Sequence, residues 1–306
     1  MARQSAVVHT AAPSADDIAI SQNENANVRL QVAARHFYRN ARLLQFLSSS
    51  INVLLALISP FVLLFQPEWG PALGAIAGGW LFVSRQVLAP FRRTFQRDGA
   101  KAQELFDCAV FGLPWNDALA RPLSHEEIGG ASRKMTKLDK LRDWYPASID
   151  RVWPASVIIC QRSSIVWARR QHHAYAYMLR TAAALWGVVG VGVAIAHGAT
   201  LTDYLVTIAL PSLPALLDAS ELADRHLASA GDREALEQQV DAVLVGDFAT
   251  QQTVREFQDQ LFSLRSESPI VATWFYRLVR SKFEHDMQYA AAQSASSTGG
   301  ERRRGS

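Results

Sequence analysis

The sequence predicts an all-α membrane protein, with four transmembrane helices in two hairpins and a helical cytoplasmic domain. Three observations support this fold class. The apolar residues are concentrated in four uncharged runs, the runs come in two pairs joined by short turns, and no stretch alternates as a strand would. A helix needs about 20 residues to cross the hydrocarbon core. The 306 residues therefore accommodate one membrane unit and one modest soluble domain.

The first hairpin and its amphipathic lead-in occupy residues 28–93. Residues 43–65 and 69–84 form uncharged runs, separated by a break that holds Pro67 and Glu68. The second run carries glycines at a spacing of four, which places them near one helix face. Small residues let another backbone approach closely in a membrane. The face is either a seam between subunits or a packing face within the hairpin, and it consists of Gly70, Gly74 and Gly78.

The second hairpin occupies residues 181–217. Residues 181–199 contain no Asp, Glu, Lys or Arg and are long enough to form a span alone, whereas residues 204–217 are shorter. The short run contains Pro211 and Pro214. Because a proline removes one backbone hydrogen bond from a helix, this run is a candidate for lining an aqueous path. The alternative is that the prolines end the helix early at the cytoplasmic face.

The positions of lysine and arginine predict the orientation of the spans. Arginines flank the first, second and third runs on one side, and the two short turns contain neither residue. Because positive charge favours the cytoplasmic side, we expect a multi-pass protein with both termini in the cytoplasm. The polar remainder divides into four segments: a disordered N-terminus (1–27), a cytoplasmic helical insertion (94–180), cytoplasmic C-terminal helices (218–292) and a disordered tail (293–306).

Local patterns refine these polar segments. Ser124 and Glu127 have the spacing of a capping box and predict a helix start. Gly99 weakens the helix expected for residues 95–106. The C-terminal segment predicts three amphipathic stretches, 219–229, 232–261 with a break near Gly246, and 269–292.

The sequence contains little that indicates catalysis. It has no phosphate-binding glycine loop, CxxC or HExxH pattern, so we expect no enzyme, no cofactor and no metal site. A membrane enzyme would have to use Cys108, Cys160 or a histidine, but a buried structural cysteine is the commoner case. His172 and His173 are adjacent and would point about 100° apart on a helix. The net charge of +3 is too small to indicate a nucleic acid polymer as partner.

A basic helix face is the best candidate for ligand binding. Arg162 and Arg169 are seven residues apart and share a face, whereas Arg170 is rotated away from it. Such a face suits the phosphate of a nucleotide signal. The alternative is that the three arginines meet anionic lipid beside the membrane.

Three groups of motifs together resemble a known family. They are AQELFDC (102–108) continuing in VFGLPWN (110–116), WYP (144–146) followed by ICQR (159–162) and Trp167, and SP (268–269) followed by WFY (274–276) and FE (283–284). With two hairpins, this pattern resembles the SMODS-associating four-transmembrane effectors of bacteria. The polar residues in these motifs that become candidate sensing or structural positions are Asp107, Asn116, Gln161 and Arg162.

The resemblance implies an effector of an anti-phage system that signals with cyclic oligonucleotides. Such an effector is expected to sense the nucleotide directly or through a partner protein, form a homo-oligomer and permeabilise the inner membrane through a pore. An alternative from another class is a membrane-anchored sensor or scaffold that passes the signal to a partner without conducting.

Overall fold

The computed structural model describes residues 14–133, 141–145, 151–276 and 278, and within these residues it contains helices and no strand. The all-α prediction is thereby confirmed. The chain divides into two compact units, residues 1–270 and 271–306. In the second unit only 271–276 and 278 are described, and helix begins there at residue 273. The predicted disordered tail and most of the stretch 269–292 lie outside the described residues.

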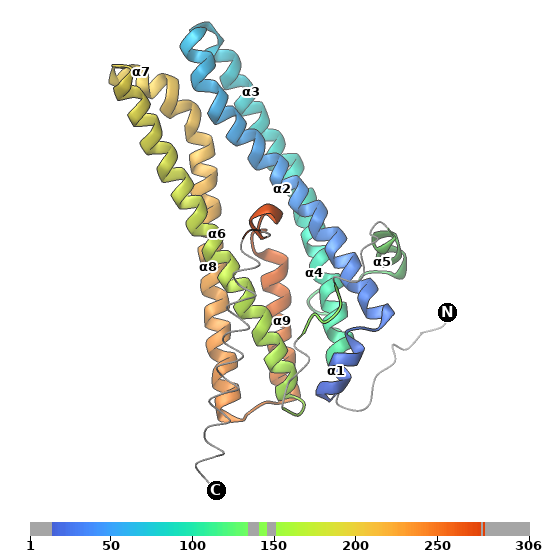
Figure 1. Ribbon diagram of the computed structural model, residues 1–306. Helices are drawn as coiled ribbons and strands as arrows, with labels where there is room; N and C mark the ends of the chain where they lie inside the picture. Colours follow the sequence, from blue (N-terminus) through green and yellow to red (C-terminus); the bar gives the residue numbers. More distant parts are fainter. Residues whose placement is uncertain (1–13, 134–140, 146–150, 277, 279–306) are drawn as a thin grey trace, which may run out of the picture. The chain divides into compact units, whose positions relative to one another are not determined.

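The first unit consists of two long helical hairpins and shorter helices around one end of them (Figure 1). Its helical segments are α1 (Ala15–Ser21), α2 (Asn25–Phe65), η1 (Pro67–Trp69), α3 (Gly70–Val83), η2 (Ser84–Leu88), α4 (Ala89–Phe111), α5 (His125–Ser132), α6 (Ala155–Ala196), α7 (Leu201–Tyr204), η4 (Leu205–Ala209), α8 (Leu210–Gly246) and α9 (Gln251–Glu267). Segment η1 is a 3₁₀ turn, and η2 and η4 are π-helical.

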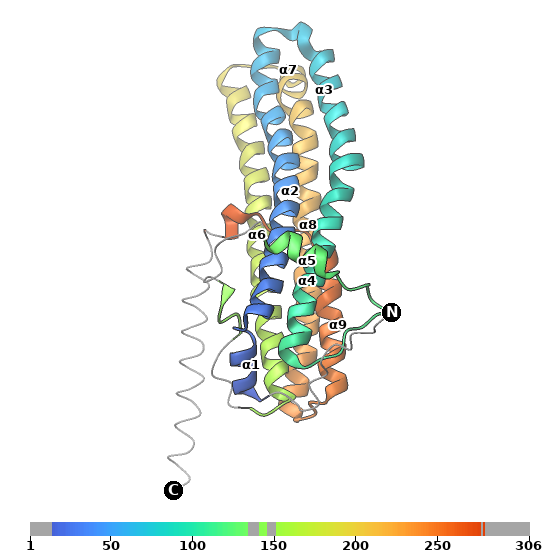
Figure 2. The same cartoon turned by 90° about the vertical axis from the view of Figure 1, so that its right-hand side faces the viewer.

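In the first hairpin α2 packs along α3 and α4, and in the second α6 packs along α8. Helix α2 also contacts α8, and this contact joins the two hairpins. Figure 2 shows α9 beside the parts of α4 and α8 that lie away from the short turns.

The long helices are too long to be spans alone. Helix α2 has 41 residues and α6 has 42, so each is about 60 Å long, twice the thickness of the hydrocarbon core. Four stretches of the described chain have the length and composition to cross a membrane: Asn25–Leu63, Gly70–Phe111, Ala155–Ala196 and Leu201–Gly246. Each helix therefore continues beyond its apolar run. We call this continuation, together with α1, α5 and α9, the stalk (described residues within 14–42, 90–180 and 218–270).

The prolines of the fourth span do not end its helix, so that alternative is wrong. Pro214 lies inside α8, which runs unbroken to Gly246. The π-helical segment η4 lies directly before α8 and thus just before Pro211. The π-helical segment η2 lies in the same way before α4 and Pro90. A π-helical turn absorbs the carbonyl that proline leaves unbonded.

Helix α8 also joins two stretches that the sequence separates. The predicted stretch 219–229 and the start of 232–261 are one helix, because Gly231 does not interrupt it. The break predicted near Gly246 is confirmed, since Asp247 caps the helix in the left-handed conformation with φ of 55°.

The predicted disorder of residues 1–27 is wrong from residue 15 onward. Ser14 and Asp17 form a capping box that starts α1, with the Asp17 amide 3.2 Å from the Ser14 hydroxyl. Ile18 is fully buried in the stalk core. A capping box and one buried isoleucine are too short a signal to stand out in a polar segment. Residues 1–13 lie outside the described part.

Two local predictions on the stalk have clear outcomes. The capping box of Ser124 and Glu127 is confirmed at the start of α5, where the Ser124 amide donates to the Glu127 carboxylate at 2.6 Å. Gly99 lies inside α4 and does not weaken it. A Cβ at Gly99 would lie 3.0 Å from the ring of Tyr38, so the glycine lets α2 approach α4 closely.

Candidate functional site

The candidate site is a buried network of charged and amide side chains between α4 and α9 in the stalk. Asp107 is fully buried and receives three hydrogen bonds: from Arg265 at 2.5 Å, from the Tyr145 hydroxyl at 2.6 Å and from the Gln258 amide at 2.8 Å. Burial alone would lower the pKa of Arg265, but the adjacent Asp107 carboxylate raises it above its ordinary value. Arg265 is therefore charged in the folded protein.

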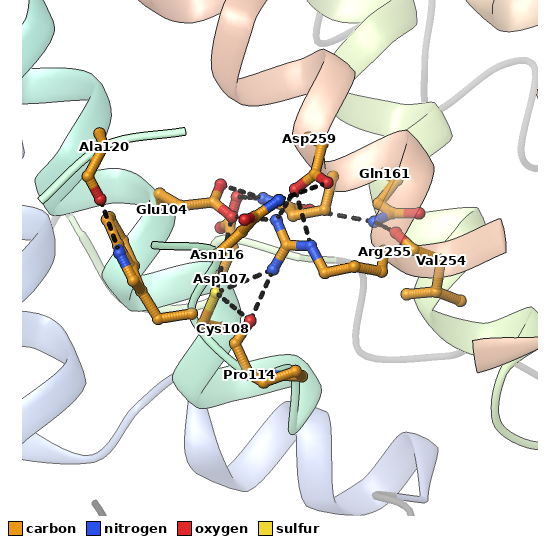
Figure 3. A network of polar contacts seen from close by, with 12 residues as sticks. Glu104, Asp107, Cys108, Pro114, Asn116, Ala120, Gln161, Val254, Arg255 and Asp259 are labelled. Atoms are coloured by element: carbon orange, nitrogen blue, oxygen red, sulfur yellow. Dashed lines mark hydrogen bonds and ion pairs between the residues drawn. The ribbon is translucent and has the colours of Figure 1, made fainter. Parts of the chain in front are cut away.

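A second ion pair joins the same two helices, one turn away on α4 and nearly three turns away on α9 (Figure 3). Arg255 donates to Glu104 at 2.5 Å and to Asp259 at 2.8 Å, and its guanidinium also reaches the Pro114 carbonyl at 2.9 Å. Burial, followed by repulsion from Asp107, raises the pKa of Glu104, whereas the Arg255 hydrogen bond opposes that shift.

Amide side chains extend the network to α6. The Gln161 amide donates to the Val254 carbonyl at 2.9 Å and to the Gln258 side-chain oxygen at 3.0 Å. Gln258 in turn donates to both Glu104 and Asp107. Asn116 lies at the edge and donates to Asp259 at 2.9 Å (Figure 3). The structure thus brings Asp107, Asn116 and Gln161 together, so the first two of the three motif groups that carry the family resemblance meet here.

The basic face predicted on α6 lies apart from this network and is already paired with α8. Arg162 contacts Asp241 at 2.5 Å and Glu237 at 3.5 Å, and Arg169 contacts Glu237 at 2.8 Å. Within the described residues Arg170 forms no ion pair. A phosphate on this face would have to displace carboxylates from Arg162 and Arg169, so the face stays a prediction that its geometry does not favour.

The environment of the titratable residues opposes nucleophilic chemistry. Burial, followed by the charge of Glu104, raises the pKa of the Cys108 thiol, and burial raises that of Cys160 to about 12. Both thiols are therefore neutral near pH 7. His172 faces His226 across α6 and α8, with 2.7 Å between the Nδ1 atoms, while no group of three or more His, Cys, Asp or Glu side chains in the described chain is placed to hold a metal.

Polar contacts also join the two hairpins where the spans meet the stalk. Arg85 of η2 reaches Asp218 at 3.3 Å and Glu221 at 3.4 Å, both on α8. Asn52 of α2 donates to Asp218 as well. Arg85 is thus engaged by α8 in the folded chain.

The glycine face of α3 is largely open within one chain. A Cβ at Gly74 or Gly78 would meet no atom within 4 Å, whereas one at Gly70 would lie 3.6 Å from Leu63. The alternative of packing within the hairpin therefore holds for Gly70 alone. Pro214 is exposed and Pro211 is half-buried on the surface of α8, and their suggested place beside a pore stays a prediction.

Sequence reasoning missed the α9 side of the network. On α9 Gln258 is buried, and Arg255 and Arg265 are half-buried beside Val254 and Leu261. The available signal for these residues was that a charged or amide side chain lies on the apolar face of an amphipathic helix. It predicts a buried partner without saying which one.

Four membrane-crossing helices that continue into a helical stalk with a buried charge network define a multi-pass α-helical membrane protein. The chain belongs to the family of the SMODS-associating 4TM effector domain, whose pattern matches residues 16–294. It is also 26% identical over 285 residues to a probable CBASS effector molecule of Bacillus cereus (strain VD146), with 87% of this chain and 94% of that protein covered. No solved structure matches the chain.

Proposed function

We propose that the protein is a pore-forming effector of the bacterial inner membrane, which permeabilises the membrane when a cyclic-oligonucleotide signal reaches the stalk. The family and the probable CBASS effector of Bacillus cereus support a role in anti-phage defence. The stalk and both termini then lie in the cytoplasm, as the arginine distribution predicts.

The observation that carries this proposal is that the long helices pass from stalk to spans without interruption. Helices α2 and α6 run from buried stalk positions to the short turns, and α8 runs from its span through the stalk to Gly246. A change in how the stalk helices pack therefore moves the spans directly. A ligand opens such a protein only if it binds the open form more tightly than the closed one.

The spans themselves favour assembly of several chains. Between 6% and 17% of the residues in each apolar window are buried within one chain, so most of each span surface faces lipid or another subunit. The open glycines Gly74 and Gly78 offer a surface for close helix approach. We therefore expect a homo-oligomer in which α8, with Pro211 and Pro214, faces the aqueous path.

The test is leakage of a dye from liposomes that contain the purified protein, measured with a panel of cyclic oligonucleotides. Release that depends on one nucleotide supports a ligand-gated pore. No release with any nucleotide, from protein shown by protease accessibility to be inserted in one orientation, would favour the non-conducting sensor or a missing partner protein.

The sensor or scaffold is the second candidate, and the polar contacts between the hairpins favour it. Arg85, Asp218 and Glu221 hold the hairpins together at the stalk boundary, an arrangement that also suits a static anchor. In that case changes at Pro211 or Pro214 leave signalling intact, whereas changes in the stalk network abolish it.

A further inference from the structure

A cavity of about 290 Å³ lies between the two hairpins, at the level where the spans meet the stalk. Both hairpins contribute to its wall: α2 through Gln45 and Asn52, α4 through Arg92, α6 through Tyr175 and α8 through Arg225. Most of these positions border the ends of the apolar runs that lie away from the short turns, whereas Asn52 lies within the first run. In a bilayer that surrounds the spans, the cavity lies at the headgroup layer.

The polar wall of the cavity has an excess of positive charge. Four arginines line it, against two carboxylates, and Arg85 already contacts both of these, Asp218 and Glu221. Arg92 bonds to the neutral side-chain oxygen of Gln45. The two remaining arginines form no ion pair within the described part of the chain: they are Arg93 and Arg225.

The arginines are also close enough to repel one another. Burial, followed by the charges of Arg225 and Arg93, lowers the pKa of Arg92. A cluster of this kind is stabilised by an anion that contacts several guanidinium groups. Arginine binds phosphate oxygens through two parallel hydrogen bonds, so phosphate is the anion that the cluster suits best.

The rest of the wall combines hydroxyl and amide side chains with an apolar part, and the apolar part favours a lipid over a soluble nucleotide. Leu44, Val53, Leu88 and Leu179 line it, as acyl chains beside the phosphate would require. Its one aromatic residue, Tyr175, is buried and packs edge-on against His226 with 4.8 Å between ring centroids. Among the described lining residues, no open aromatic face is therefore available to stack a nucleobase.

We propose that this cavity binds the phosphodiester headgroup of an anionic phospholipid, held by Arg92, Arg93 and Arg225. Basic pockets between transmembrane helices at the cytoplasmic face are known places for anionic headgroups. Because the cavity wall comes from both hairpins, the bound lipid tethers α4 to α8. Cyclic oligonucleotides share the phosphodiester chemistry, so the experiment must separate the two sources.

Native mass spectrometry of the full-length chain in detergent tests the proposal. Three ligands are added separately: phosphatidylglycerol, phosphatidylcholine with the same acyl chains, and a soluble cyclic dinucleotide. The dinucleotide is then also added, at equal concentration, to protein that carries phosphatidylglycerol. We expect phosphatidylglycerol to remain bound in preference to both others. The R93Q/R225Q double variant should lose about fivefold in phosphatidylglycerol affinity for each arginine, about 25-fold in all.

Matched variants separate this site from general surface charge. Arg97→Gln changes an exposed arginine on the same helix that does not line the cavity, and it should bind phosphatidylglycerol like the wild type. The single variant R93Q serves if the double variant does not fold, as judged by circular dichroism and gel filtration, and should lose about fivefold.

Two outcomes would overturn the proposal. One is equal affinity of wild type and R93Q/R225Q for phosphatidylglycerol, or of phosphatidylglycerol and phosphatidylcholine for the wild type. The other is displacement of bound phosphatidylglycerol by the cyclic dinucleotide at equal concentration, which would assign the cavity to the soluble phosphodiester. The measurement involves no conduction, so its result does not depend on whether the protein forms a pore.

Discussion

Replacing Asp107 by asparagine tests the buried network most sharply. The side chain keeps its shape but loses its charge, and three donors depend on it: Arg265, Tyr145 and Gln258. The amide of asparagine presents an NH₂ group to one of these donors. Arg265 is left charged in a site where its side chain is 10% exposed.

The expected cost follows from that burial. Removing one partner of a buried ion pair destabilises a protein by about 3–5 kcal/mol, because the remaining charge is unpaired in a low-dielectric site. A surface pair contributes about 0–1 kcal/mol. Asp107 is 0% exposed, so the larger range applies.

Hydrogen exchange of α9 amides, followed by mass spectrometry of the detergent-solubilised protein, measures the effect locally. If α9 opens together with the network, a cost of 3–5 kcal/mol accelerates exchange by about 100-fold to 4000-fold. Asp98→Asn is the matched control on α4. Its carboxylate is 23% exposed and, among the described residues, forms an ion pair only with Lys101 one turn away, at 3.1 Å, so Asp98→Asn should change exchange less than about fivefold.

A double variant distinguishes loss of the pair from loss of a single group. D107N/R265Q removes both charges, so its cost should be less than the sum of the two single variants by at least about 1 kcal/mol. Acceleration below tenfold in Asp107→Asn, or costs that simply add in the double variant, would refute the reasoning.

Three further predictions concern pH and helix contacts. Burial and nearby arginines lower the pKa of His226 to about 3, below the ordinary value of about 6.5, so the unfolded chain binds the proton first as pH falls. His226 should therefore contribute a loss of about 2 kcal/mol in the free energy of unfolding between pH 7 and pH 5; if His226→Gln lost as much stability as the wild type over this range, measured by thermal unfolding, the assignment would be contradicted. Gly99→Val drives its side chain into the Tyr38 ring and should cost about 1–3 kcal/mol, unlike Gly231→Val, where no atom lies within 4 Å; equal melting temperatures would be evidence against the close approach. A Cβ at Gly78 would meet no atom of its own chain within 4 Å, so Gly78→Leu should fold normally while the oligomer seen by native mass spectrometry dissociates, and an unchanged oligomer would exclude the seam.

The membrane half of the fold was predictable because a bilayer imposes a simple rule. Uncharged runs of about 20 residues, such as 181–199, have few alternatives to a spanning helix. The pairing of the apolar runs and the absence of lysine and arginine from the turns predicted the two hairpins. What these runs lacked was a signal for where the helices end, since α8 passes both Pro214 and Gly231.

The site was only half predictable because its partners are distant in sequence. Asp107 and Gln161 belong to recognisable motifs, but Arg265 lies 158 residues beyond Asp107. The same limit explains the basic face on α6. In the sequence Arg162 and Arg169 have no visible partner. In the structure their partners Glu237 and Asp241 come from α8, more than 60 residues further along the chain.

Current through a planar lipid bilayer is the most direct test of conduction. The purified protein is added with the cyclic oligonucleotide that gives the greatest dye release, and Gly78→Leu serves as the assembly-deficient control. A pore predicts discrete current steps of uniform size that require the nucleotide and are absent for Gly78→Leu. A flat baseline from inserted wild-type protein, or irregular breakdown that both proteins share, would contradict a gated pore.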